Sequence, residues 1–434
     1  MRLLTQNAVF MENAYLENDE DAVRITRKAF ILTSILSTPF WAIYTLLLFI
    51  LYKDLHASPF QITVFVILRP LVSIFSLYWS ARVKNRPDRL LPNIMWAGIL
   101  GSFPFLFFPF IDNPWYFIGA SALYMTLVRG VFPAWMEVLK LNLPSEIRKQ
   151  TISYATTISF VGGGVLSLLI GWMLDDFYQV WRLIFPVTAI LNMVAIAYQY
   201  RIPIASPKDK PFQALSPVTP LRDRLLDPWN NVWDLLNSKV DFRNFHIGYM
   251  LGGFGLVIIQ PALPHFFMDQ LHLSYTELTT AITFCKGIAF AFASPIWARW
   301  LNAGNIFRFS SLVAFLAGLS PLLLVLAQIN LSWIFIAYLL YGVMQSGSEL
   351  SWHLAGPIFS QGEDSSTYSS VNLAVVGLRG CVAPLMGGML LNAFSPDVVL
   401  IVGALFSFSG SFRLYLNKHP AQESISNLAI VEKS

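Results

Sequence analysis

Four basic side chains lie deep within long apolar stretches of this sequence: Arg69, Arg129, Lys286 and Arg379. An ionised group costs roughly 2.5–3.5 kcal/mol at the centre of a membrane helix, so a cation there usually has a specific partner. Cations that face one cavity would bind a carboxylate or a phosphate. We therefore take all four as candidate substrate-binding residues. For Arg69, Lys286 and Arg129, a structural contact with helix carbonyls or a carboxylate remains an equal alternative.

Three titratable side chains are candidates for carrying a coupled proton: Glu349, Glu137 and His353. Glu349 ranks first, because a low-dielectric site favours the protonated carboxyl and a nearby arginine opposes that preference. Arg379 either binds solute or pairs with Glu349, and we favour the pair. An interfacial charge is the main alternative for Glu137, and an ordinary structural group for His353.

Four polar or aromatic side chains lie at depths where a solute cavity is expected: Trp41, Tyr124, Gln260 and Trp352. We include them as candidate substrate contacts by depth alone. The two cysteines, Cys285 and Cys381, lie in apolar runs and are expected to be small buried side chains. We expect no metal site, no catalytic residue and no cofactor.

Membrane helices must position these residues, because the composition excludes a water-soluble surface. The chain is 55% hydrophobic and only 12% charged, whereas soluble domains carry about 25% charged residues. About 20 apolar residues cross about 30 Å of hydrocarbon, and the runs here are too continuous for barrel strands. The expected spans are 29–52, 59–81, 90–111, 114–138, 150–174, 180–202, 245–268, 275–298, 308–328, 331–355, 366–392 and 397–416.

Lys and Arg concentrate in every second connection: in both tails, in the links 82–89 and 140–149, and in the long link 203–244. Basic residues accumulate on the cytoplasmic side of membrane proteins. Both termini are therefore expected in the cytoplasm, with Lys53 and Arg182 as the exceptions on the opposite side. The polar N-terminus and the low cysteine count fit a bacterial inner (cytoplasmic) membrane.

The two halves of the sequence repeat with an offset of about 217 residues. Matching pairs are Arg69 with Lys286, Ala81-Arg82 with Ala298-Arg299, Trp135 with Trp352, Gly163 with Gly380, and Gly171 with Gly388. We predict an all-α membrane protein of twelve transmembrane helices in two pseudo-symmetric six-helix bundles. The predicted divisions are a tail 1–28, a bundle 29–202, a linker 203–244, a bundle 245–416 and a tail 417–434.

The long link contains one amphipathic segment. Asp227 and Pro228 have the residue types of a helix N-cap and first position. Apolar residues then recur at helical spacing through Trp229, Val232 and Leu236. This pattern predicts a helix that either lies in the membrane interface or serves as a soluble linker helix with one apolar face.

These features resemble the major facilitator superfamily over about residues 25–418. Residues 76–89 carry cations like those of the family's motif between spans two and three, although its leading glycine and its aspartate are missing. Residues 380–388 match the family's Gly-x-x-x-Pro-x-x-Gly-Gly pattern, for which close helix packing is the simpler explanation. The resemblance implies alternating access, and Arg129 resembles the family's fourth-span arginine, which is associated with proton coupling.

We therefore predict a secondary active transporter that moves an organic anion by alternating access with coupled protons. An exporter of amphipathic or drug-like compounds and a transport-inactive receptor or assembly factor remain alternatives. An intramembrane transferase is disfavoured, because the histidines form no catalytic or metal-binding pattern. The expected partners are a small-molecule substrate, protons and the lipid bilayer, with no nucleic acid, and the chain is expected to be a monomer.

Overall fold

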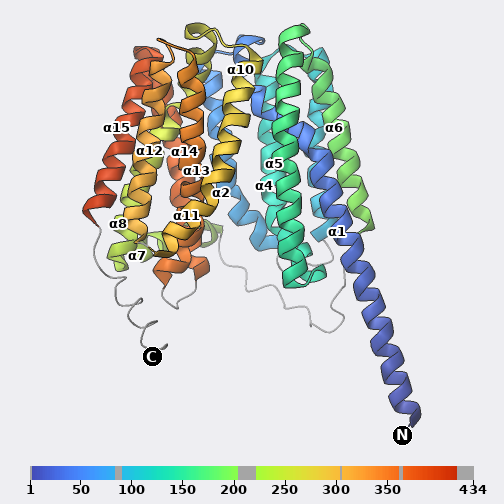
Figure 1. Cartoon of the computed structure of the whole chain (residues 1–434). Coiled ribbons are helices and arrows are strands. Elements are labelled where there is room, and N and C mark those ends of the chain that lie inside the picture. The colour runs from blue at the N-terminus through green and yellow to red at the C-terminus, as the bar shows by residue number, and fades with distance from the viewer. Residues whose placement is uncertain (1, 84–89, 204–220, 304, 361–364, 418–434) are drawn as a thin grey trace. The chain divides into compact units, whose positions relative to one another are not determined.

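The computed structural model describes the backbone of residues 2–83, 90–203, 221–303, 305–360 and 365–417. The side chains of residues 2–19, 73–83, 221–228 and several shorter stretches within these helices are not described. All regular structure in the described residues is helical (Figure 1). The all-α membrane fold class predicted from the sequence is confirmed.

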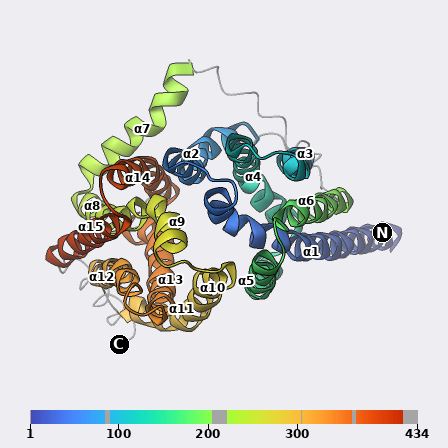
Figure 2. The same ribbon diagram turned by 90° about the horizontal axis from the view of Figure 1, so that it is seen from above.

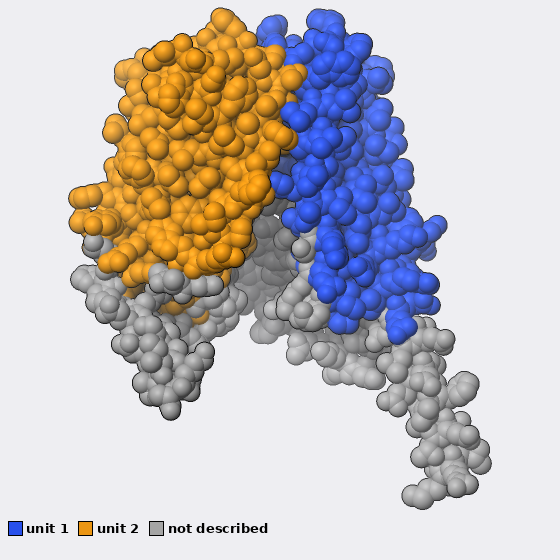
Figure 3. Space-filling model, viewed as in Figure 1, with its two compact units in different colours: residues 1–57, 72–217 blue, residues 58–71, 218–434 orange. Residues whose placement is uncertain are grey.

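The chain divides into two compact units (Figure 3). Unit 1 contains residues 1–57 and 72–217, and unit 2 contains residues 58–71 and 218–434. Helix α2, Pro59–Val83, contributes to both. The first part of α2, which carries Arg69, therefore belongs to the same unit as Lys286.

Unit 1 is built from long helices joined by short links. Its elements are α1 (Arg2–Lys53), α3 (Leu90–Ser102) with the 3₁₀ helix η2 (Phe103–Phe110), α4 (Pro114–Asn142), α5 (Ser145–Asp176), α6 (Trp181–Tyr198) and the 3₁₀ turn η3 (Gln199–Arg201). Helix α1 is 52 residues long and extends through the predicted N-terminal tail. Asn113 caps α4 by accepting a 3.0 Å hydrogen bond from the backbone of Trp115.

Unit 2 follows a similar order of helices. Its elements are α7 (Leu221–Ser238), α8 (Val240–Ile258), η4 (Gln260–Ala262), α9 (Leu263–His265), η5 (Phe266–Gln270), α10 (Tyr275–Thr279), η6 (Thr280–Cys285), α11 (Lys286–Ala303), α12 (Ile306–Leu326), α13 (Ser332–Ser360), α14 (Ser365–Ala393) and α15 (Pro396–Leu416). The seventh predicted span is interrupted near Pro261 and Pro264, because neither proline can donate a backbone hydrogen bond. Helix α13 is 29 residues long, like α4 at the matching place in unit 1.

Each predicted span coincides with a helical segment of the structure. In the described part of the chain, nine helical segments are long and apolar enough to cross a membrane, and Pro59–Val72 is a shorter apolar helix. Large apolar side chains are exposed along these helices, including Phe292 at 75% and Val165 at 63%. Such surface is expected to face lipid.

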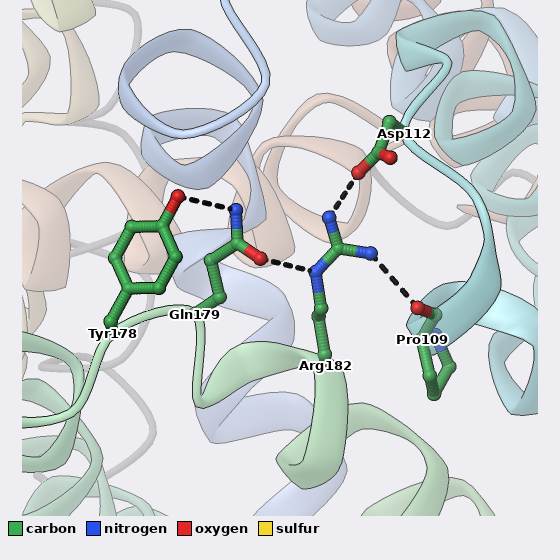
Figure 4. Close-up of polar contacts among 5 residues, drawn as sticks. All are labelled: Pro109, Asp112, Tyr178, Gln179 and Arg182. Atoms are coloured by element: carbon green, nitrogen blue, oxygen red, sulfur yellow. Dashed lines mark hydrogen bonds and ion pairs between the residues drawn. The ribbon is translucent and has the colours of Figure 1, made fainter.

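Arg182, at the start of α6, forms contacts that link neighbouring segments of unit 1 (Figure 4). Its Nε donates to Gln179 Oε1 at 2.7 Å, and its Nη1 donates to the carbonyl oxygen of Pro109 at 2.9 Å. Its Nη2 forms an ion pair with Asp112. Arg182, one of the two basic exceptions to the charge pattern, therefore ties α6 to the link between η2 and α4.

Helix α7 packs on unit 2 beside α8 and α14 (Figure 2). Its residues Val232, Leu235 and Leu236 contact a buried cluster that includes Phe242. The predicted helix start at Asp227 is wrong, because α7 begins at Leu221. One hydrogen bond lost at a proline does not end a helix whose next turns are held by tertiary packing.

Candidate functional site

Helices α2 and α14 make a close contact within unit 2, and an arginine flanks it on each helix. A Cβ atom built on Gly380 would overlap the ring of Pro70, so only glycine allows this approach. Arg69 directly precedes Pro70, and Arg379 directly precedes Gly380. Helix packing thus brings the neighbourhoods of Arg69 and Arg379 together, which sequence periodicity could not indicate.

A second close contact, between α11 and α13, positions Lys286. A Cβ atom on Gly342 would overlap the carbonyl oxygen of Lys286, and Trp297 Nε1 donates to the carbonyl oxygen of Val343 at 2.7 Å. Lys286 follows directly after η6, which is a π-helical segment. Such segments are rare and frequently occur at functional sites.

Tyr341 interacts with three of the cations in unit 2: Lys286, Arg69 and Arg379. The Nζ atom of Lys286 is 6.0 Å from the centre of the Tyr341 ring. Arg69 and Arg379 both lie within electrostatic range of Tyr341, and Arg69 also repels Lys286. We call Arg69, Lys286, Arg379 and Tyr341 the cationic cluster.

Arg379 is held by backbone more than by side chains. Its Nη1 donates to the carbonyl oxygen of Tyr249 at 3.4 Å, and its buried Nε has no hydrogen-bond partner. Its guanidinium group occupies the space that a side chain at Gly253 would fill. Arg379 therefore keeps unused hydrogen-bond donors in a partly buried position, and a donor left unsatisfied there is costly.

The pair that we favoured between Arg379 and Glu349 is not formed in the structure. Glu349 Oε2 instead lies 3.9 Å from Nε2 of His353, and both side chains are exposed. The Tyr249 hydroxyl donates to the carbonyl oxygen of Ser348 at 3.1 Å and lies within electrostatic range of Arg379 and Glu349. Tyr249 therefore interacts electrostatically with both the cation and the carboxylate.

The other candidates fall in separate places. Tyr124 is only 2% exposed and packs against Phe40 and Trp41, whereas Trp41 itself is half-buried. In unit 2, Gln260 Nε2 donates to the carbonyl oxygen of Leu256 at 3.3 Å, and the Trp352 carbonyl accepts from Asn372 at 3.1 Å. The predictions for Arg129 and Glu137 concern side chains outside the described residues.

Tyr341 is a candidate site residue that no sequence pattern indicated. Tyr341 is one of 16 tyrosines. Only the tertiary structure sets it apart, because it precedes Gly342, the glycine that contacts Lys286. The thiols Cys285 and Cys381 are free and half-buried. Among the described residues, no three His, Cys, Asp or Glu side chains are grouped as a metal site.

A family model described as the Major Facilitator Superfamily matches residues 29–354. The match covers well over half of the chain. The chain belongs to the major facilitator superfamily. Residues 29–354 span all of the first predicted bundle and most of the second.

Solved structures of other major facilitator transporters share this fold. The nucleoside transporter NupG superposes with a TM-score of 0.67 at 12% identity, covering 91% of this chain and 100% of that one. A POT family transporter in complex with 5-aminolevulinic acid gives 0.68 at 12% identity, covering 91% and 95%.

A bacterial homologue of the human lysosomal transporter Spinster gives a TM-score of 0.59 at 15% identity, covering 93% of this chain and 99% of that one. No curated protein matches the sequence. At these identities the structural likeness concerns the fold alone. As a member of the superfamily, the chain is an integral membrane transporter for a small molecule and is not an enzyme.

Proposed function

We propose that this major facilitator protein is a secondary active transporter that moves an organic anion by alternating access, with protons as the coupling ion. The observation that carries the proposal is the cationic cluster of unit 2. Within the described ranges, neither Lys286 nor Arg379 forms an ion pair with a carboxylate. Charges buried without a partner are costly, and a bound anion would offset that cost.

The fold by itself does not select the substrate, because one scaffold serves many functions. Its structural neighbours include a nucleoside transporter and POT family transporters. The choice of an anion therefore rests on Arg69, Lys286 and Arg379. Arg129, Trp41, Tyr124, Gln260 and Trp352 remain proposed contacts in addition to this cluster.

Glu349 is the proposed proton carrier, with His353 one turn away on the same face of α13. Its carboxylate lies within electrostatic range of Tyr249, whose backbone carbonyl accepts the hydrogen bond from Arg379. A change in the charge of Glu349 would therefore alter the electrostatic potential near Arg379. Glu137 remains a second proposed carrier.

We further propose the bacterial inner membrane as the location, with both termini in the cytoplasm, and a monomer as the working unit. The charge pattern supports the orientation, since basic residues cluster in alternate links. The two six-helix bundles at 29–202 and 245–416, with the linker 203–244 and the tails 1–28 and 417–434, remain the proposed division of the chain.

Uptake by proteoliposomes tests the proposal directly. Purified protein should accumulate an organic anion when a pH gradient is applied. Arg69→Gln and Lys286→Gln should each weaken anion binding and leave folding intact, whereas Arg308→Gln removes an exposed cation of α12 and serves as the control. Unchanged affinity in both cluster variants would refute the anion site. Absence of transport for any solute would favour a transport-inactive receptor.

The coupling role of Glu349 has its own test. Glu349→Gln should retain exchange of labelled substrate between the two sides of the membrane and lose accumulation against a gradient. His353→Gln provides the comparison on the adjacent turn. Full accumulation by the Glu349→Gln protein would exclude Glu349 as the proton carrier.

A further inference from the structure

Two cations without a carboxylate partner approach Tyr341 from different helices of unit 2. Lys286, at the start of α11, places its Nζ 6.0 Å from the centre of the Tyr341 ring. Arg379, on α14, interacts electrostatically with the same residue. In the part of the chain that the structure describes, neither of these two cations is paired with Asp or Glu.

The number of charges on the ligand follows from this arrangement. A ligand with one negative charge would neutralise one cation and leave the other without a counter-charge in a partly buried position. Arg69 adds to this cost, because its charge repels Lys286. A ligand with two negative charges would satisfy both Lys286 and Arg379.

Arg379 has hydrogen-bonding capacity that the described residues do not use. Its bond to the carbonyl oxygen of Tyr249 is long, at 3.4 Å, and its buried Nε makes none. Tyr341 is half-buried beside these groups and carries a hydroxyl that can donate. A hydrogen bond from a hydroxyl to a charged oxygen is among the strong ones in proteins.

We infer that the transported solute is a dianion, with Lys286 and Arg379 neutralising its two charges and the Tyr341 hydroxyl donating to one of its oxygens. This inference rests on the proposed function and narrows it from organic anions to those with two charges. A dicarboxylate and a phosphate monoester share this chemistry. Tyr341 is then a further binding residue, which the pattern of deep cations did not indicate.

Calorimetric titration of the full chain in detergent separates these ligands. The probes are succinate and glycerol 3-phosphate, with butyrate as a monoanion of matched carbon number and glycerol as an uncharged control. We expect at least one dianion to bind about tenfold or more tightly than butyrate, the gain typical of one further charge-assisted hydrogen bond. The two dianions distinguish a carboxylate site from a phosphate site.

Variants test whether Lys286 and Arg379 each neutralise one charge of the dianion. Lys286→Gln and Arg379→Gln should each lower dianion affinity more than butyrate affinity, so that the preference for two charges falls. Lys286→Arg keeps the charge and should keep the preference. Tyr341→Phe should weaken both kinds of anion by a similar factor, about tenfold, and thus leave the preference unchanged. Thermal unfolding of each variant must match that of the parent protein.

The outcomes separate this inference from the proposed function. If butyrate binds as tightly as both dianions, the dianion inference fails and an anion transporter still stands. If neither kind of anion binds, the proposed function itself fails. If Lys286→Gln and Arg379→Gln fold normally and keep the full preference for dianions, the assignment of the charges to these residues is overturned.

Discussion

The guanidinium group of Arg379 lies directly over Gly253, in space that any other residue at position 253 would fill. This contact joins α14 to α8 and leaves Arg379 within reach of the carbonyl oxygen of Tyr249. The atoms nearest to a Cβ on Gly253 belong to the end of the arginine side chain. That end can move without a shift of either helix.

Gly253→Ala should therefore displace Arg379 and lower anion affinity about tenfold, with little change in stability. The predicted loss corresponds to one interaction with a charged group. Alanine also favours the helix by up to about 1 kcal/mol over glycine, which offsets part of any strain. Titration with succinate and thermal unfolding measure the two effects on the same protein.

Substitutions at two other glycines serve as controls for this prediction. A Cβ on Gly255 would overlap the backbone oxygen of Gly403, so Gly255→Ala should destabilise unit 2 by about 1–3 kcal/mol. A Cβ on Gly164 meets nothing within 4 Å, so Gly164→Ala should leave affinity unchanged and stabilise the protein by up to about 1 kcal/mol. Normal affinity in Gly253→Ala would contradict the role given to this contact.

Gly388→Ala should destabilise the protein by about 1–3 kcal/mol, because its Cβ would overlap the Oγ1 of Thr63 on α2. Removing that oxygen should relieve the strain. Thr63→Ala combined with Gly388→Ala should thus cost less than the sum of the two single changes, as a double-mutant cycle measures. Strict additivity would argue against the packing of residues 58–71 on α14.

Asp112→Asn should lower the stability of unit 1 by up to about 1 kcal/mol, because it weakens an ion pair in which the Arg182 side chain is sheltered although Asp112 is 75% exposed. Arg182 is only 21% exposed in its side chain and has two further partners, so its position is fixed. The exposed pair Arg24 and Asp21, at 78% and 64%, is the matched control. Arg24→Gln should change stability by less than about 0.5 kcal/mol; equal losses in both variants would contradict the distinction.

Asn142→Ala should destabilise unit 1 by about 1–3 kcal/mol. The Nδ2 atom of Asn142 donates to Thr26 Oγ1 at 2.9 Å and to the carbonyl oxygen of Pro203 at 2.7 Å. The side chains of Asn142 and Thr26 are buried, so the Thr26 hydroxyl would lose its donor in a region with little water. Thermal unfolding should show a smaller loss for Thr26→Val, which removes one of the two bonds.

Much of the fold was predictable from local sequence. Runs of about 20 apolar residues determine membrane helices, because a backbone in lipid must satisfy its own hydrogen bonds. Helix ends are less determined by sequence. The start of α7 at Leu221 depends on how neighbouring segments pack, whereas the break in the seventh span follows locally from Pro261 and Pro264.

The candidate site was likewise predictable from the sequence only in part. The sequence alone identified Arg69, Lys286 and Arg379, because the cost of a charge in lipid depends on depth, and depth can be counted along a helix. Only the tertiary structure placed Arg69 in the unit of Lys286, brought Tyr341 into interaction with these cations and separated Arg379 from Glu349. Those relationships arise where α2 meets α14 and α11 meets α13, and contacts between helices far apart in the chain leave no periodic signal in either one.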